Sequence, residues 1–354
     1  MKKKLDYLIV GQGLAGSFLA FQLLQENKSF MIVDKGLSFS SSHIAAGIIN
    51  PLVLRRYTKT WRAEEFLEYN EGFYDKIHSF LSKKYHFKLP IKKLISSKEE
   101  EMFWHQRLKK EDLSDFIEPE LKNGEDLISI KKHFKYGNVK QTSWLNISAF
   151  LEDFRKYLNS NQLLVEEEFE YTLLKNQQYK AIEFEKIIFC EGSKAKNNPF
   201  FPTNAFSLNK GQLMTIKSES LQSKDILKKK VFVLPIKGNE YKIGATYSWK
   251  WNQTCDKGNH EVETEKTEQL KDMFNEIFEG EYTIKNIEAG VRPAVKDRRP
   301  LIGKHPKKEH IYFFNGMGSK GCFMAPLLSK EFTNYLEKSQ ELTPDVNIQR
   351  YFLS

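Results

Sequence analysis

The chain has 354 residues, of which 40% are hydrophobic and 29% are charged. This composition is ordinary for a globular protein and excludes collagen-like, low-complexity and disordered chains, while the length suggests two domains. The net charge of +9 comes mainly from lysines interleaved with Glu and Asp, which favours a solvated surface and leaves an RNA-binding surface as the alternative.

The cysteines indicate a reducing compartment. Cys190, Cys255 and Cys322 stand far apart, and neither they nor the histidines have metal-ligand spacing, so we predict no disulfide framework and no metal. The first apolar run stops at Gly11, which is too early for the core of a signal peptide. No stretch is long enough to span a bilayer. We therefore expect a cytoplasmic protein without a membrane partner.

The first predicted unit is a strand, a glycine turn, a helix and a second strand that ends in an acid. Residues 7–16 read YLIVGQGLAG, and the second strand ends at Asp34. Gly11 allows the tight turn, Gly13 lets the backbone approach a pyrophosphate, and Gly16 lets the helix pack on the strand. The helix N-terminus favours phosphate, and Asp34 suits a ribose hydroxyl. This unit predicts a dinucleotide site; an ordinary βαβ unit with incidental glycines is the alternative.

The remaining pattern predicts an α/β fold. Apolar periodicity and turn residues indicate elements at 61–84 (helix), 147–158 (helix), 186–192 (strand and turn), 231–247 (hairpin), 264–278 (helix) and 310–336 (strand, glycine loop, helix). We assign residues 1–88, 142–212 and 287–354 to a Rossmann-like nucleotide domain. Residues 89–141 and 213–286 then form a mixed α+β substrate domain with a β-sheet.

Four motifs together resemble the FAD-dependent D-amino-acid-oxidase-like superfamily, which includes glycine oxidase and sarcosine oxidase. They are the N-terminal unit, SSHIAAG at 41–47, GVRP at 290–293 with DRRPLIG at 297–303, and GMGSKG at 316–321 followed by Ala-Pro. The motifs span nearly the whole chain in the family's order. The last one is also similar to the oxidase half of the bifunctional enzyme that modifies the wobble uridine of tRNA.

The resemblance implies a two-domain FAD-linked oxidoreductase. It would oxidise a C–N bond by hydride transfer to flavin N5, followed by hydrolysis of the imine and reoxidation by O₂ or another acceptor. FAD would be non-covalent, because Ile44 separates His43 from Ala-Ala-Gly and Cys322 has the character of a buried apolar residue. The implied FAD-binding residues are Gly11, Gly13, Leu14, Ala15, Gly16, Asp34, Lys35, Ser42, His43, Ala46, Gly47, Gly192, Gly316, Gly318, Ser319, Lys320 and Gly321.

Arg292 and Lys320 are the predicted catalytic residues. The guanidinium of Arg292 suits a substrate carboxylate, with an internal salt bridge as the alternative. Lys320 either adds charge beside the flavin, contacts substrate, or is a solvated lysine. The resemblance places Phe232 where glycine oxidase carries a substrate-binding tyrosine. This counts against a simple amino-acid oxidase, because the hydrogen bond of that hydroxyl is missing unless Tyr247 or Tyr241 supplies it.

The leading hypothesis is oxidation of a small amino acid or N-alkyl amino acid. The alternative is a tRNA-modifying oxidoreductase that acts on 5-carboxymethylaminomethyl-uridine at the wobble position, because this substrate is also an amine with a carboxylate. A flavin-binding module without turnover and an enzyme that uses only NAD are further alternatives. The intact Arg292 motif disfavours the first of these, and the glycine-rich C-terminal unit disfavours the second.

Overall fold

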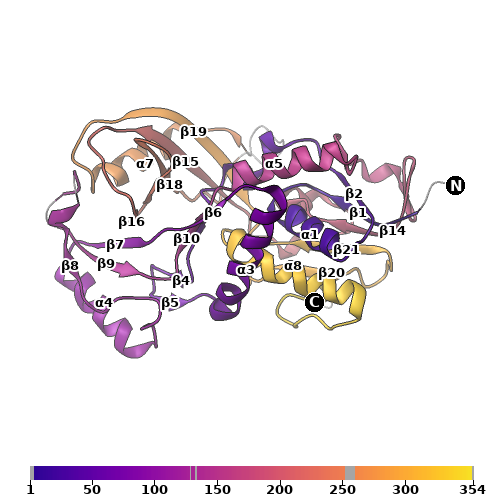
Figure 1. The fold of residues 1–354 in the computed structure, drawn as a ribbon, viewed down its shortest axis with the longest axis horizontal. Coiled ribbons are helices and arrows are strands. Elements are labelled where there is room, and N and C mark those ends of the chain that lie inside the picture. Colours follow the sequence, from indigo (N-terminus) through magenta and orange to yellow (C-terminus); the bar gives the residue numbers. More distant parts are fainter. Residues whose placement is uncertain (1–3, 128, 132–133, 252–259, 353–354) are drawn as a thin grey trace.

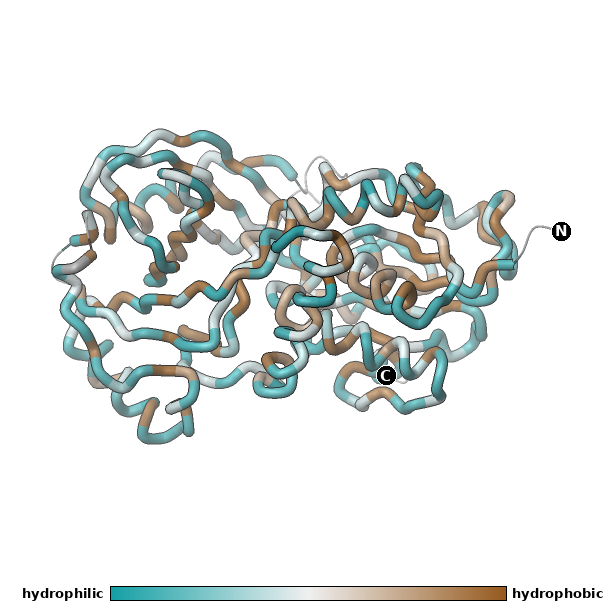
Figure 2. Tube along the Cα trace, viewed as in Figure 1, coloured by the Kyte–Doolittle hydropathy of each residue, from teal (hydrophilic) through white to brown (hydrophobic). Residues whose placement is uncertain are grey.

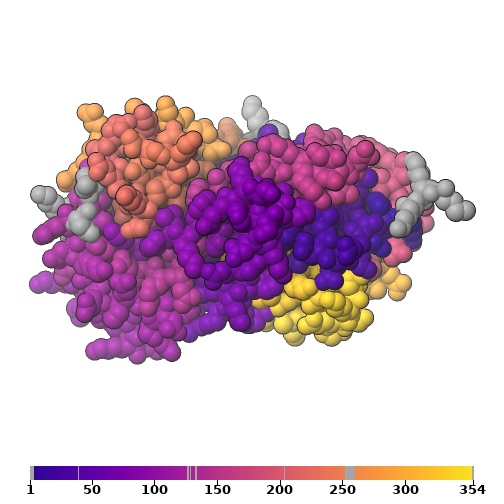
Figure 3. Space-filling model, viewed as in Figure 1, coloured from indigo at the N-terminus to yellow at the C-terminus, as the bar shows by residue number. Residues whose placement is uncertain are grey.

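The computed structural model describes residues 4–127, 129–131, 134–251 and 260–352, so Cys255 lies outside the described residues. Figure 1 shows two lobes, each built around its own sheet. In the space-filling view the N-terminal and C-terminal segments adjoin in the right lobe (Figure 3). Within the described ranges, no helix combines the length and apolarity that crossing a membrane requires.

The first sheet joins distant segments of the chain. Its central strand β14 pairs in parallel with β1 on one side and with β21 on the other. The strands are β1 (Leu5–Val10), β2 (Phe30–Val33), β11 (Leu164–Val165), β12 (Leu174–Lys175), β13 (Gln178–Tyr179), β14 (Ile182–Phe189), β20 (Leu301–Lys304) and β21 (Ile311–Asn315). Since β1, β2, β11, β14 and β21 run parallel, their carboxyl ends meet at one edge of the sheet.

Side-chain alternation gives this sheet two apolar faces. Tyr7 and Ile9 pack with the helices of one face, while Leu8 and Val10 belong to the core of the other. Apolar residues accordingly run along the central strands in Figure 2. The helices that contribute to the first face are α1 (Leu14–Gln25), α3 (Ala63–Leu81), α5 (Ile147–Ser160) and α8 (Gly321–Lys338).

The second sheet has eight strands in the order β19–β15–β18–β17–β16–β7–β9–β8. Helix α7 (Thr264–Asn275) packs on one face through Leu270 and Phe274. The strands are β7 (Ile91–Ile95), β8 (Lys122–Asn123), β9 (Lys135–Val139), β15 (Asn209–Lys217), β16 (Ile226–Lys228), β17 (Phe232–Pro235), β18 (Glu240–Gly244) and β19 (Thr283–Arg292).

Short elements connect the two lobes. They are α2 (Ser41–Ile44), β3 (Ile48–Ile49), β4 (Leu52–Val53), β5 (Thr58–Lys59), β6 (His86–Lys88) and β10 (Ser143–Leu145), with α4 (Lys98–Lys110) on the second lobe. The predicted α/β fold is confirmed. The domain divisions proposed at 212/213 and 286/287 fall inside β15 and β19, which pair with each other in the second sheet.

The packing of α1 on β1 yields a stability prediction. A Cβ at Gly16 would lie 2.0 Å from the carbonyl oxygen of Gly11, so Gly16→Ala can be accommodated only if α1 moves away from the turn at Gly11. We expect a loss of about 1–3 kcal/mol in the free energy of unfolding, measured by urea denaturation. Gly72→Ala is the control, because a Cβ at this α3 position meets nothing within 4 Å. It should leave stability equal or raise it by about 0.5–1 kcal/mol. Equal midpoints for Gly16→Ala and the wild type would contradict the packing argument.

Candidate functional site

A cavity of about 1290 Å³ lies between the two lobes. The first sheet contributes residues at the carboxyl ends of its parallel strands, such as Asp34 and Gly192. The second sheet contributes Phe232 and Arg292. The volume exceeds the roughly 300–1000 Å³ of a typical small-ligand pocket, so the cavity can hold a long cofactor together with a substrate.

The turn before α1 has the geometry of a phosphate site. Gly11 has φ of +102°, and a Cβ there would lie 2.7 Å from the carbonyl oxygen of Cys190. Gly13 precedes the helix and lines the cavity, and the N–H of Leu14 donates to Oγ of Ser42 at 3.1 Å. The N-terminus of α1 therefore faces the cavity, and because Gly13 has no side chain, a phosphate can approach the backbone there.

Asp34 is held in place but keeps capacity to bind a hydroxyl. Its Oδ1 accepts hydrogen bonds from the N–H of Gly36 at 2.8 Å and from Nη1 of Arg155 at 2.9 Å. Its Oδ2 accepts one from the N–H of Gln12 at 2.8 Å. Because each carboxylate oxygen has about two acceptor sites, one site on Oδ2 is left for a ribose hydroxyl. Sequence analysis missed Arg155, whose contact spans 121 residues.

Most of the predicted FAD-binding residues surround this cavity; Gly16, His43 and Gly316 do not line it. Gly16 packs against Gly11, and a Cβ at Gly316 would meet Val295. His43 turns away from the cavity, and its Nε2 lies 3.1 Å from Oε1 of Glu152.

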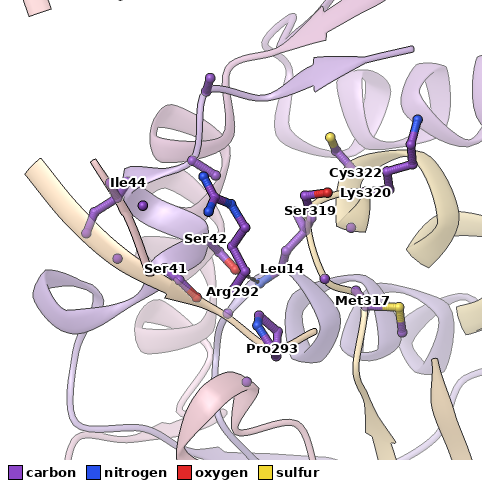
Figure 4. A pocket seen from close by; sticks show the side chains of 18 of the residues that line it. Leu14, Ser41, Ser42, Ile44, Arg292, Pro293, Met317, Ser319, Lys320 and Cys322 are labelled. Atoms are coloured by element: carbon purple, nitrogen blue, oxygen red, sulfur yellow. Dashed lines mark hydrogen bonds between the residues drawn. The ribbon is translucent and has the colours of Figure 1, made fainter. Parts of the chain in front are cut away.

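Arg292 ends β19 and points into the cavity (Figure 4). Its Nη1 donates to Oδ1 of Asn209 at 2.6 Å, and its guanidinium lies 4.6 Å from the centre of the Tyr247 ring. A Cβ at Gly211 would come within 2.3 Å of Nη2, so the absence of a side chain there makes room for the guanidinium. Arg292 forms no ion pair with a carboxylate in the part of the chain that the structure describes. Burial lowers its pKa from the usual value, but a guanidinium stays charged.

Lys320 precedes α8 and also lines the cavity. Its Nζ donates to the carbonyl oxygens of Asn50 at 2.7 Å and Leu52 at 3.3 Å. Burial lowers the pKa of this amine to about 8. Two neutral carbonyl oxygens thus hold the ammonium group of Lys320 beside the pocket. Figure 4 shows Lys320 on the side of the pocket opposite Ser41, Ser42 and Ile44.

The other predicted residues differ in placement. Phe232 and Tyr247 line the cavity, and Tyr247 is 55% exposed. Tyr241 is buried elsewhere, with its hydroxyl donated to the carbonyl of Leu221, so Tyr247 is the tyrosine that reaches the cavity. Cys322 lines the cavity as a buried thiol whose pKa burial raises to about 12. Among the described residues, no group of three His, Cys, Asp or Glu could hold a metal ion.

The profile of the family described as FAD dependent oxidoreductase (DAO) matches residues 6–335. The chain belongs to this family. Glycine oxidase of Bacillus subtilis is 22% identical over 92% of this chain and 91% of the relative. Among solved structures, glycine oxidase from Bacillus cereus has a TM-score of 0.79 at 18% identity, covering 96% of both chains. Iminodiacetate oxidase from Chelativorans sp. has a TM-score of 0.80 at 15% identity, covering 98% of both.

Membership confirms the predicted enzyme class and cofactor: the protein is an FAD-dependent oxidoreductase. The residues present are compatible with FAD. The α1 N-terminus and Gly13 suit its pyrophosphate, and Oδ2 of Asp34 suits its ribose. A Cβ at Gly192 would meet nothing within 4 Å, so the cavity is open there as well.

Gly13→Val tests the pyrophosphate placement. Gly13 has φ of −74° and ψ of −169°, which valine accepts, so the fold should persist while the new side chain protrudes near Ser42. We expect purified Gly13→Val to retain little or no FAD, measured by the ratio of flavin to protein absorbance. Gly72→Val on the exposed face of α3 is the matched control and should stay yellow. A fully loaded Gly13→Val would refute the placement.

Proposed function

We propose that the protein oxidises the C–N bond of an amino acid or N-alkyl amino acid and that Arg292 binds the substrate carboxylate. The observation that carries this proposal is the position of Arg292. It lines the same cavity as most of the predicted FAD-binding residues, and within the described structure it forms no ion pair with a carboxylate. The names of the similar proteins, glycine oxidase and iminodiacetate oxidase, support the same substrate class.

In this mechanism the residues orient the substrate. The guanidinium of Arg292 donates two parallel hydrogen bonds to the carboxylate, while Asn209 and Tyr247 fix the plane of the guanidinium. FAD, held by the α1 N-terminus and Asp34, would supply the redox chemistry by taking up the hydride from the substrate carbon attached to nitrogen. Water then hydrolyses the imine to a carbonyl compound and an amine, and O₂ or another acceptor takes the electrons. A neutral amine needs orientation rather than a proton-abstracting side chain, so Arg292 and the positive charge of Lys320 suffice as the catalytic set.

A second candidate function is oxidation of the carboxymethylaminomethyl group of a tRNA wobble uridine. One observation favours it: Tyr247 and Trp249, which are 55% and 63% exposed, stack with ring centres 6.2 Å apart and line the cavity. Exposed aromatic rings beside cationic side chains are typical of surfaces that stack unpaired bases. The carboxylate of this substrate would also bind Arg292.

Anaerobic reduction of the flavin separates these functions. The holoenzyme is mixed without oxygen with glycine, sarcosine, proline, D-amino acids, or tRNA that carries the carboxymethylaminomethyl group, and the flavin absorbance is followed. We expect a free amino acid or N-alkyl amino acid to bleach the flavin. Bleaching by tRNA alone would favour oxidation of the wobble uridine over oxidation of a free amino acid. A flavin that no carboxylate-bearing amine bleaches would overturn both.

Arg292→Ala tests the carboxylate contact. Loss of a buried charge-assisted contact costs about 2–5 kcal/mol, so kcat/KM should fall roughly 30-fold or more, mainly through KM, with FAD still bound. The measurement is steady-state kinetics with the substrate identified by flavin bleaching. The exposed Arg298→Ala is the matched control and should behave as wild type. Unchanged kinetics in Arg292→Ala would remove the assignment.

A further inference from the structure

Two lysines lie side by side on the wall of the cavity in the second lobe. Strands β7 and β16, which are neighbours in Figure 1, pair in parallel with Lys93 opposite Lys228 and Ile91 opposite Ile226. Because side chains alternate along a strand, these four residues share one face of the sheet. All four line the cavity. The pairing therefore places two lysines on neighbouring strands at the same level of the cavity wall.

Both lysines are held by neutral oxygens. Lys93 is only 8% exposed, and its Nζ donates to the carbonyl of Leu94 at 3.0 Å. Nζ of Lys228 donates to the carbonyl of Lys230 at 2.9 Å. Within the described residues neither forms an ion pair with a carboxylate. Lys93 is buried and Lys228 is half-buried, and two adjacent cations in such surroundings destabilise each other unless an anion joins them.

The surrounding charges keep this end of the cavity positive. Burial, followed by the nearby charge of Lys229, lowers the pKa of Lys93 to about 8. Burial and the charge of Lys93 lower the pKa of Lys228 to the same value. Glu100 lines this end too; its carboxylate pairs with Lys229 and also offsets part of the lowering of the Lys93 pKa. At pH 7 both amines are mainly charged.

Arg292 belongs to the same face of the sheet at some distance from the lysines. Lys228 pairs with Phe232 on β17, Phe232 pairs with Gly244 on β18, and Gly244 pairs with Leu213 on β15. Gly211, beneath the Arg292 guanidinium, lies on the same face of β15 as Leu213. Three strand spacings separate β16 from β15, which is roughly 14 Å along the sheet. Phe232 and Leu213 form an apolar floor between the two positive ends.

We propose that Lys93 and Lys228 form a second oxyanion site, which binds an anionic group at the far end of the substrate. This inference rests on the proposed function for the role of Arg292. The substrate class is then an elongated amine with one carboxylate near the reacting C–N bond and a second oxyanion, a carboxylate or a phosphate, roughly 14 Å away. A substrate as small as glycine would leave the two lysines without an anion.

Direct binding tests the site without turnover. Isothermal titration of the holoenzyme uses glutarate as the carboxylate probe and inorganic phosphate and uridine 5′-monophosphate as the phosphate probes. We expect Lys93→Met and Lys228→Met each to weaken binding about tenfold or more. Lys237→Met, which removes an equal charge from the exposed hairpin turn, should bind as wild type. A preference for glutarate assigns the second group to a carboxylate, and a preference for the phosphate probes assigns it to a phosphate.

Arg292→Ala separates this proposal from the proposed function. It lacks the first carboxylate contact but should keep the binding event that Lys93→Met weakens. Flavin content and the urea midpoint show whether each variant is folded, and Lys228→Arg should restore binding by returning the charge. Equal affinity of wild type, Lys93→Met and Lys228→Met for every probe, or no binding by the wild type, would overturn the second site even if glycine bleaches the flavin.

Discussion

The antiparallel pairing of β15 with β19 is the constraint on which the substrate half of the cavity depends. It runs from Asn209 opposite Arg292 to Lys217 opposite Thr283. The pairing sets Arg292 beside the amide that holds it and above Gly211, where a side chain would collide with the guanidinium. Both strands belong to the second sheet, and Arg292 at the end of β19 lines the cavity that residues after the parallel strands of the first sheet also line. A slip in register by one residue would turn Arg292 to the opposite face.

The half of the cavity that suits FAD depends on a different feature: parallel strands from separate parts of the chain end at the same edge of the first sheet. Strand β14 separates β1 from β21, so the turns after all three strands open toward one edge. Helices α1 and α8 begin near that edge and direct their positive ends toward the cavity. A cofactor with phosphates and an electron-accepting ring therefore meets favourable charge at both of its ends. The fold supplies this charge through backbone, which explains why glycines rather than charged side chains dominate the motifs.

Local sequence motifs predicted the part of the site that is formed by the turn after β1 and the end of β2. The turn from Gly11 to Gly16 and the acid Asp34 follow one another within a single βαβ unit, so their roles can be argued from spacing alone. Arg155 could not be found in this way, because it reaches Asp34 across 121 residues. His43, a predicted FAD-binding residue, lies outside the cavity because successive residues of a helical turn point in different directions: Ser42 faces Leu14 while His43 faces Glu152. The meeting of Lys93 with Lys228 depends on which strands become neighbours, and the sequence of either strand carries no sign of that choice.

Four cations of the cavity, Arg292, Lys320, Lys93 and Lys228, share one feature, which is that their partners are neutral oxygens, whereas Lys229 pairs with Glu100. Asn209 holds Arg292, two carbonyls hold Lys320, and the carbonyl of Leu94 holds Lys93. A carboxylate partner would stabilise the ligand-free protein more, but it would cancel the charge that an anionic substrate needs. An amide or carbonyl oxygen fixes the position of the cation and leaves its charge intact. The protein thus bears a cost in stability before binding, and an anion of matching geometry offsets that cost when it enters. This arrangement supports the proposed selectivity for anionic amines, because a neutral ligand would leave buried cations without compensation.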